Sequence, residues 1–394
     1  MADHTLNIAI IGAGIGGLAA ASLLRSIGHQ VRVFEQAGQF GRVGAGIQMT
    51  PNAMQVLRRL GLEPALRAIA YEPEIALSRE FDSGRITNQF AIAAAMEHKY
   101  GAPFFVLHRA DLHGLLAADH AQDSINFGKK LVSLEQDSRE VRLRFADGSV
   151  AHADLVVAAD GVHSLVNTIL FGRQDAVFTG RVAYRTTFPA ALLGSRPLDP
   201  ARTKWWGPDR HIVMYYVTAK RDEIYFVTSQ PEDAAWLTQE SWSAKGNLDE
   251  LRSAFSEFHP DVQHVLQCCP DVHKWGLFIR DPLARWSNGR VVLLGDACHP
   301  MPPYMAQGAA SALEDAAVLS RCVATMVDNG PAEMAKAFDL YEGTRKPRAS
   351  RIQAASGANN WMRHASEANP DWVYGYNPWK APLVSMDRAI SRES

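Results

Sequence analysis

Residues 8–25 read IAIIGAGIGGLAAASLLR, and this stretch decides the fold. Its first four residues are apolar and predict a buried parallel strand, and the glycines after them predict a phosphate-binding turn before a helix over residues 18–25. Gly12 allows the tight turn, Gly14 lets the backbone approach a pyrophosphate, and Gly17 lets the helix pack closely on the strand. Free N–H groups at the start of the helix favour phosphate oxygens. The stretch therefore predicts a dinucleotide site at the start of the chain.

A second strand, over residues 31–34, ends at Glu35. A carboxylate at this point can accept hydrogen bonds from ribose hydroxyls and would repel a 2′-phosphate, so it favours FAD or NAD over NADP. A lone glycine motif is weak support for such a site. The order of strand, turn, helix, second strand and acid makes it much stronger.

Length and composition describe an ordinary globular protein of 394 residues, with 47% hydrophobic and 21% charged residues. This length suggests two domains or one elaborated domain. The net charge of −2 gives no electrostatic case for nucleic acid or an anionic membrane as a partner. We see no apolar run that would span a bilayer and no room for a signal peptide, so we expect a cytoplasmic protein. We also expect a monomer or a homodimer.

The four cysteines show no metal-ligand spacing, so no metal site is predicted. They are Cys268, Cys269, Cys298 and Cys322. A bridge between the adjacent first two would be strained, and we expect four free thiols in a reducing compartment.

The pattern along the rest of the chain predicts an α/β fold with an insertion. Buried strands at residues 155–158 and 291–294 repeat the pattern of the first, and an apolar-faced helix that includes residues 312, 316 and 319 follows the last. Between them, residues 181–227 are rich in strand-forming and aromatic residues and predict an inserted antiparallel sheet. We expect helix from about residue 330 until Pro370, with the aromatic residues after it packed on the body.

Three strand ends carry turns of the kind that bind ligands at the edge of an α/β sheet: residues 12–17, Asp160-Gly161 and the sequence GDACHP at residues 295–300. In this order they resemble the class A flavoprotein aromatic monooxygenases, the para-hydroxybenzoate hydroxylase superfamily, over nearly the whole chain. The resemblance implies a Rossmann-like FAD-binding domain of the GR2 type with an inserted antiparallel β-sheet substrate domain and a C-terminal helical segment. The implied boundaries are 1–70, 101–175 and 280–330 for the FAD-binding domain, 71–100 and 176–279 for the substrate domain, and 331–394 for the C-terminal segment.

The resemblance also implies how FAD is held. Asp296 would bind the ribityl chain, Arg109 would contact FAD, Leu131 would lend backbone atoms near the adenine, and the helix that begins near Gly308 would direct its N–H groups at the flavin. Arg42 would approach the FAD phosphate or NADH. The full set of expected cofactor contacts is Gly12, Gly14, Ile15, Gly17, Glu35, Gln36, Arg42, Gln48, Arg109, Leu131, Asp296, Gly308 and Ala309. One departure is Asn167, at a position where relatives usually place arginine, which leaves any contribution of that position to NADH binding open.

Within the superfamily the chain most resembles the 6-hydroxynicotinate 3-monooxygenases, on residues 204–206, 209–211 and 371–376. There and in the 3-hydroxybenzoate 6-hydroxylases, a histidine and a tyrosine four residues apart line the substrate cavity, and His211 and Tyr215 match them. Residues four apart on an extended strand share a face but lie about 13 Å apart, so one small substrate needs a bend or a long tyrosine reach. The alternatives are that His211 is a surface histidine after an Asp-Arg turn and that Tyr215 is a core tyrosine.

Three other expected substrate residues differ from the nicotinate enzymes. Gln48 and Tyr304 stand where those carry histidines, and Arg202 stands where they carry a cysteine. Gln48 and Tyr304 keep hydrogen-bonding capacity without titrating near neutral pH. Arg202 reads either as a solvated arginine or, if it points inward, as a bidentate partner for a carboxylate.

The chemistry implied by the resemblance is that NADH reduces FAD, O2 forms a flavin C4a-hydroperoxide, and its distal oxygen attacks a ring carbon made electron-rich by an ionised hydroxyl. His211 is the expected base, with Tyr215 as its hydrogen-bonding partner. We expect para-hydroxylation of a hydroxylated pyridine or aromatic carboxylate, with 6-hydroxynicotinate going to 2,5-dihydroxypyridine and CO2. The alternatives are a 3-hydroxybenzoate 6-hydroxylase or salicylate hydroxylase type, an FAD-dependent reductase without O2 chemistry, and a flavin-binding protein without turnover.

Overall fold

The first strand lies at the centre of a six-stranded sheet. The structure is a computed structural model, and it describes residues 5–42, 45–120, 124–174, 176–233, 245–365 and 369–393. The sheet has the order β17-β18-β11-β1-β2-β7, and all its pairs are parallel except that of β17 with β18. Its strands are β1 (Asn7–Ile11), β2 (Gln30–Phe34), β7 (Ile125–Asn126), β11 (Leu155–Ala158), β17 (Ser287–Asn288) and β18 (Val291–Leu293). The predicted parallel α/β core is confirmed.

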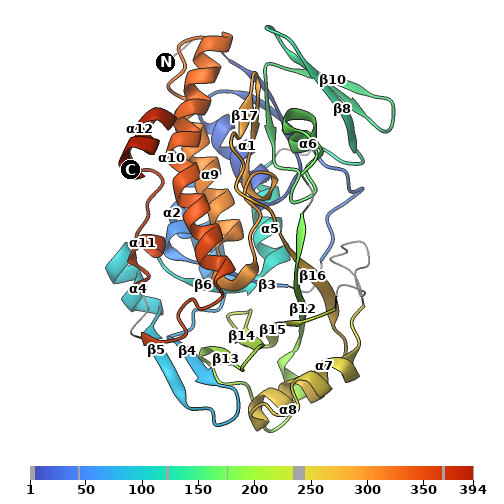
Figure 1. Cartoon of the computed structure of the whole chain (residues 1–394), viewed down its shortest axis with the longest axis vertical. Coiled ribbons are helices and arrows are strands. Elements are labelled where there is room, and N and C mark those ends of the chain that lie inside the picture. Colours follow the sequence, from blue (N-terminus) through green and yellow to red (C-terminus); the bar gives the residue numbers. More distant parts are fainter. Residues whose placement is uncertain are drawn as a thin grey trace.

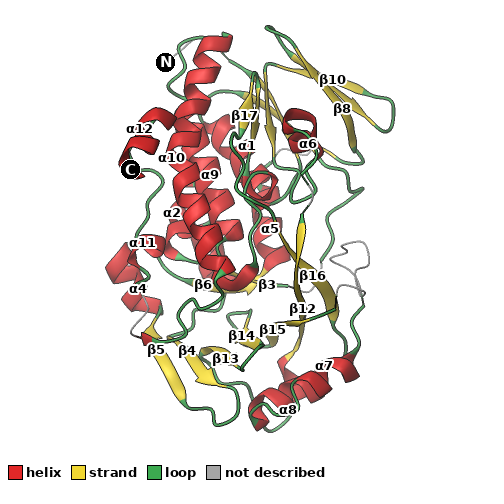
Figure 2. Ribbon diagram, viewed as in Figure 1, coloured by secondary structure: helices red, strands yellow, loops and turns green. Residues whose placement is uncertain are grey.

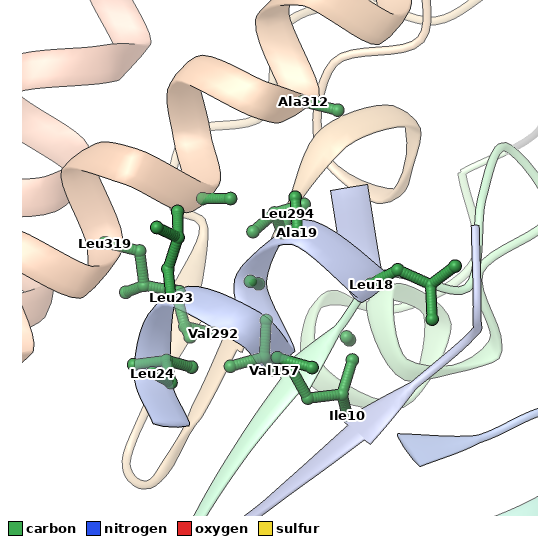
Figure 3. Packing of buried hydrophobic residues seen from close by; sticks show 14 of the residues in the cluster. Ile10, Leu18, Ala19, Leu23, Leu24, Val157, Val292, Leu294, Ala312 and Leu319 are labelled. Carbon is green, nitrogen blue, oxygen red and sulfur yellow. The ribbon is translucent and has the colours of Figure 1, made fainter. Parts of the chain in front are cut away.

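Helix α1 (Ile15–Ser26) packs between this sheet and helix α9 (Gly308–Val323), as Figure 3 shows. The helix begins at Ile15 and not at residue 18, so the prediction of its start was wrong. The helix can begin this early because its first turn contains glycine. A Cβ at Gly16 would come within 2.7 Å of Leu294 and 2.9 Å of Ala312. Side chains that fill the layer include Ile10, Leu23, Leu24, Val157, Val292 and Leu319.

A group of smaller elements completes this half of the molecule. Three strands between residues 131 and 153 form the sheet β10-β9-β8, and β3 pairs with β6. The strands are β3 (Gly46–Met49), β6 (Phe105–His108), β8 (Leu131–Gln136), β9 (Val141–Phe145) and β10 (Val150–Ala153). The helices are α2 (Pro51–Arg59), α3 (Glu63–Ile69), α4 (Ala93–Tyr100), α5 (Arg109–Ala118) and α6 (Leu165–Phe171). The expected turn at Gly44 lies outside the described residues.

The inserted region forms a seven-stranded sheet of order β16-β12-β15-β14-β13-β4-β5. The predicted antiparallel sheet over residues 181–227 is confirmed by the pairs of β12 with β15, β15 with β14 and β14 with β13. The sheet continues to β4, which pairs with β13 in parallel. The strands are β4 (Ile75–Glu80), β5 (Ile86–Ala91), β12 (Val177–Pro189), β13 (Arg202–Trp206), β14 (His211–Tyr216), β15 (Glu223–Pro231) and β16 (His273–Ile279).

The two faces of this sheet are covered differently. Helices α7 (Leu248–Ala254) and α8 (Pro260–Cys268) cover one face, where Trp205, Ile212 and Phe226 are buried. Figure 2 shows these two helices at the end of the molecule opposite the six-stranded sheet. Val213 and Tyr225, on the other face, pack with residues from β6 and from the C-terminal segment. The second face therefore lies between the two halves, where a substrate can meet a cofactor.

The C-terminal segment runs back along the first half. In Figure 1, α10 (Pro331–Gly357) lies beside α9, with which it makes many contacts. The prediction of helix up to Pro370 was wrong: α10 ends at Gly357, and Asn359 adopts a left-handed conformation with φ 49° that asparagine tolerates. Short helices α11 (Asp371–Tyr374) and α12 (Met386–Glu393) follow. The expected packing of the aromatic tail is confirmed, since Tyr374 is buried and Trp379 donates to the Gln55 carbonyl at 3.0 Å.

All four cysteines are free, as predicted. Among the helices that the structure describes, none has both the length and the hydropathy needed to cross a bilayer.

Candidate active site

The glycine turn after β1 has the geometry of a phosphate site. Gly12 has φ +99°, and a Cβ there would collide with the carbonyl of Ala159; a Cβ at Gly17 would collide with the carbonyl of Gly12. Gly14 differs from both, because it has an ordinary φ of −72° and a Cβ there would meet no protein atom within 4 Å. Gly14 caps α1 directly before Ile15, where the first N–H groups lack intrahelical acceptors. The turn therefore presents bare backbone to an anion.

Glu35 holds the turn from the end of β2. Its carboxylate accepts from the Ala13 N–H at 2.9 Å and from the Ala37 N–H at 2.8 Å. Gln36 beside it is exposed. The Lys129 N–H donates to the Glu35 carbonyl at 2.8 Å, which brings the start of β8, at Leu131, to the same strand end. The residues expected around the ribose and adenine thus gather at one place.

The residues expected near the flavin gather at the start of α9. A Cβ at Gly308 would lie 3.9 Å from the Asp296 carboxylate, and Ala309 follows in the first turn. Arg109, the first residue of α5, interacts with Asp296 through charge. Both side chains are accessible to solvent, yet burial among protein atoms shifts the pKa of Asp296 upward and that of Arg109 downward. The two groups are therefore packed among protein atoms and still open to a ligand.

These groups fit FAD. The open backbone at Gly14 and the start of α1 suit the pyrophosphate, Glu35 suits the ribose, and Asp296 with the start of α9 suits the flavin end. The fit rests on the open backbone at the glycine turn and on an accessible cation–carboxylate pair at the start of α9.

Arg42 is placed differently from the expectation. Its guanidinium pairs with Asp111 of α5 and lies 3.6 Å from Glu223 of β15. It therefore bridges the two halves of the molecule.

Asn167 is buried and donates to the Ala297 carbonyl at 2.8 Å. It ties α6 to the turn that carries Asp296.

The expected substrate residues lie on the inner face of the seven-stranded sheet. Trp206 of β13 is paired with His211 of β14, while Arg202 is paired with Ala76 of β4 and Tyr215 with Tyr225 of β15. The strands bring these residues to one face because each lies an even number of positions from the others along its strand. His211 and Tyr215 lie on the same face of β14, as predicted, with Val213 between them. Because they stand at opposite ends of the strand, they contact different neighbours.

Tyr215 lies next to Gln48. The two side chains hydrogen-bond, and the Tyr225 ring lies 5.2 Å from that of Tyr215. Burial raises the pKa of Tyr215 well above its ordinary value, so its hydroxyl is a neutral donor. Arg202 and Gln48 line a small cavity together with Met305, Trp361 and Tyr374. This confirms that Arg202 points inward, away from bulk solvent.

His211 lies between the rings of Trp206 and Tyr304, with centroid distances of 5.3 and 5.4 Å. The Tyr304 hydroxyl is 2.9 Å from Ser229 Oγ, on the neighbouring strand. Burial lowers the pKa of His211 well below its ordinary value, and the charges of Lys204 and two arginines add to the effect. The imidazole is therefore neutral at pH 7 and a weaker base than expected from its intrinsic pKa.

One prominent residue was missed as a site residue. Lys204 lies between Arg202 and Trp206 on the inner face of β13, is 2% exposed, and places Nζ 3.6 Å from the centre of the Trp206 ring. Burial, with repulsion from nearby arginines, lowers the pKa of Lys204 well below its ordinary value. The two-residue alternation of a strand would have identified it, because a residue two positions from Arg202 shares its face.

A buried ion network supports the start of α9. Arg345 of α10 pairs with Glu314 at 2.6 Å and with Asp315 at 2.7 Å, and none of the three is exposed. His299 Nε2 lies 2.5 Å from Asp315, so this histidine has a structural role in the network. Asn52 of α2 donates to Glu314 at 2.6 Å and to Gln307 at 2.9 Å. The network fixes the loop before α9 on the first half of the molecule.

Fold and site together define a dinucleotide-binding α/β protein with a small cavity, lined by Arg202 and Gln48, beside the loop that leads into α9. A family model described as an FAD binding domain matches residues 5–356. The chain therefore belongs to this FAD-binding family, and its relatives place it among the class A flavoprotein aromatic monooxygenases.

The similarity extends over whole chains. The chain is 45% identical over 386 residues to a 6-hydroxynicotinate 3-monooxygenase of Bordetella bronchiseptica, covering 98% of this chain and 99% of that one. It is 42% identical over 380 residues to a protein of the same name from Pseudomonas fluorescens, covering 96% and 97%. Among solved structures, a salicylate hydroxylase with its substrate matches with a TM-score of 0.78 at 25% identity, covering 95% and 96%.

Proposed function

We propose that this protein is an NADH-using monooxygenase that hydroxylates a hydroxylated pyridine or aromatic carboxylate para to its hydroxyl. The specific candidate reaction converts 6-hydroxynicotinate to 2,5-dihydroxypyridine, with oxygen entering at the carboxylate carbon and CO2 leaving. The observation that carries the proposal is the inner sheet face, where His211 and Tyr215 are buried and the partly buried Arg202 lines a cavity with Met305, from the loop that leads into α9. The similarity to two 6-hydroxynicotinate 3-monooxygenases supports this substrate class.

Each of these side chains has a chemical task in the proposal. Arg202 binds the ring carboxylate, since it lines the cavity and its Nε has no partner among the described residues. Tyr215 donates a hydrogen bond to the substrate, because its raised pKa keeps the hydroxyl protonated. His211 is neutral and therefore able to accept the proton of the ring hydroxyl, and the resulting negative charge enriches the ring carbon that is attacked.

FAD, when bound, supplies the activation of O2. The residues expected to hold it are Gly14, Glu35, Arg109, Asp296 and Gly308. The chain's own contribution is to keep water from the reacting atoms, and the buried rings of Trp206, Tyr225 and Tyr304 suit this task.

We also propose that NADH is the electron donor and that the protein is cytoplasmic. Glu35, at the end of β2, favours a cofactor without a 2′-phosphate for the resident site. NADH would enter only transiently. The four free cysteines support a reducing compartment, such as the cytoplasm.

The test is a substrate panel with the purified flavoprotein: 6-hydroxynicotinate, 3-hydroxybenzoate and salicylate, with NADH oxidation, O2 uptake and product mass followed together. Coupled formation of 2,5-dihydroxypyridine and CO2 from 6-hydroxynicotinate is the expected result. If only another ring gives a coupled product, the protein is a monooxygenase and that ring is its substrate. The absence of O2 uptake with every compound would favour the reductase alternative.

A further inference from the structure

Two cations on the inner sheet face, the buried Lys204 and the partly buried Arg202, have no negative partner among the described residues. Lys204 and Arg202 lie two positions apart on β13, and no carboxylate among the described residues forms an ion pair with either. The charged groups that act most strongly on Lys204 are all positive: Arg202, Arg363 and Arg181. Buried cations are costly unless they are paired, so this arrangement is unfavourable in the protein alone.

No carboxylate in the described part of the chain pairs with Lys204, and the groups around it suit an anion. Nζ lies 3.6 Å from the centre of the Trp206 ring and 6.0 Å from that of Tyr304. The Arg363 guanidinium is 5.4 Å from the Trp206 ring, and its buried Nε has no hydrogen-bond partner in the described part of the chain. The C-terminal segment thus adds a second cation beside Lys204, opposite the sheet. Aromatic walls with two cations make a dry site for a negative group.

Arg202 forms a separate cationic position. It lines the cavity with Gln48 and Tyr374, and its Nε also lacks a partner within the described structure. Neighbouring side chains on one face of a strand are about 6.6 Å apart at their Cα atoms. That spacing suits two substituents of one ring, each facing its own cation.

We propose that the ring substrate of this protein carries two anionic substituents besides its hydroxyl, one bound by Arg202 and the other by Lys204 with Arg363. This inference rests on the proposed function and makes its substrate class narrower: a hydroxylated aromatic or pyridine dicarboxylate. Lys204 and Arg202 then act as specificity-determining residues. Entry of the two negative groups pairs cations that repel one another in the free protein.

The test compares binding within matched pairs of ligands that differ by one carboxylate. The pairs are 6-hydroxynicotinate with 6-hydroxypyridine-3,5-dicarboxylate, 3-hydroxybenzoate with 5-hydroxybenzene-1,3-dicarboxylate, and 4-hydroxybenzoate with 4-hydroxybenzene-1,3-dicarboxylate. Each is titrated into the FAD-loaded protein without NADH, and the change in the flavin absorption spectrum gives Kd. We expect at least one dicarboxylate to bind about tenfold or more tightly than its partner, since a buried charge-assisted pair is added.

Variants assign the preference to its residues. Lys204→Met is expected to reduce the preference to less than about threefold while monocarboxylate binding remains. Lys220→Met, the same change at an exposed lysine in the turn between β14 and β15, should keep the preference. Flavin absorbance of both variants shows that they fold and bind FAD. If Lys204→Met did not bind FAD, Lys204→Gln would replace it in the same titrations.

Other outcomes separate this inference from the proposed function. Equal binding within all three pairs by the unmodified protein would overturn the inference, as would a preference that survives in Lys204→Met. The inference would also be overturned if a monocarboxylate bound as tightly as its dicarboxylate partner with its hydroxyl ionised. A phenolate absorption band would show this ionisation and would assign Lys204 to the ionised oxygen. Coupled turnover of a monocarboxylate in either case leaves the proposed function intact. Failure of all compounds to bind or to support O2 uptake would contradict both.

Discussion

Replacing Gly14 by alanine separates cofactor binding from folding. A Cβ at Gly14 would meet no protein atom within 4 Å, and the residue has φ −72°, which alanine adopts without strain. The substitution also reduces the freedom of the unfolded chain, so the free energy of unfolding of the FAD-free protein should stay constant or rise by about 0.4–1 kcal/mol. The same methyl group would occupy the space where the backbone is expected to meet the pyrophosphate. FAD binding should therefore weaken at least tenfold, or about 1.4 kcal/mol.

Gly17→Ala is the matched control. Its Cβ would collide with the backbone carbonyl of Gly12, which has no side chain that can move aside. This variant should lose about 1–3 kcal/mol of stability, as overpacked sites do. Denaturant unfolding of the FAD-free proteins and titration with FAD, followed by quenching of flavin fluorescence, measure both quantities. The reasoning is refuted if Gly14→Ala binds FAD like the unmodified protein, or if it destabilises the FAD-free protein as much as Gly17→Ala does.

Three further predictions concern buried charges. Arg345→Met should lower the free energy of unfolding by about 3–5 kcal/mol, because it leaves the carboxylates of Glu314 and Asp315 buried without their shared cation; a loss below about 1 kcal/mol in urea unfolding would contradict this. Lys204→Met should raise the free energy of unfolding at pH 7 by about 1–3 kcal/mol, since it removes a buried cation that has no carboxylate partner among the described residues, and an equal or lower stability would count against that description. Burial alone would raise the pKa of Asp315, but His299 and Arg345 lower it from 3.8 to about 2. The stabilisation from this carboxylate is therefore present above pH 3.8 and is lost as the pH falls toward 2. In acid unfolding over that interval, Asp315→Asn should lose less free energy of unfolding than the unmodified protein.

The cofactor half of the molecule could be predicted from local sequence. The turn at Gly12 and Gly14, the acid at Glu35 and the strand ending at Asp296 each follow from short stretches whose chemistry is set by their neighbours in the chain. Their gathering at one sheet edge follows from parallel strand order, because the carboxyl ends of parallel strands share an edge. The exact start of α1 could not be predicted from the local sequence, because it depends on how closely Gly16 approaches Leu294 and Ala312.

The substrate half depended on pairing between distant segments. Nothing in the local sequence shows that β4 joins β13 in parallel, or that Arg42 pairs with Asp111 and Glu223. The loss of basicity of His211 likewise comes from side chains on other strands. Lys204 could have been found, because strand alternation places it with Arg202, but its lack of a carboxylate partner is visible only once the whole face is assembled.

The most direct test of the central claim is the fate of labelled oxygen. The purified FAD-loaded protein would be supplied with NADH, 6-hydroxynicotinate or another hydroxylated ring carboxylate that binds, and ¹⁸O2, and the product would be analysed by mass spectrometry. The account predicts one ¹⁸O atom in each product molecule, on the ring carbon para to the original hydroxyl. A product that carries oxygen from water, or NADH oxidation that consumes no O2 with any of these compounds, would contradict it.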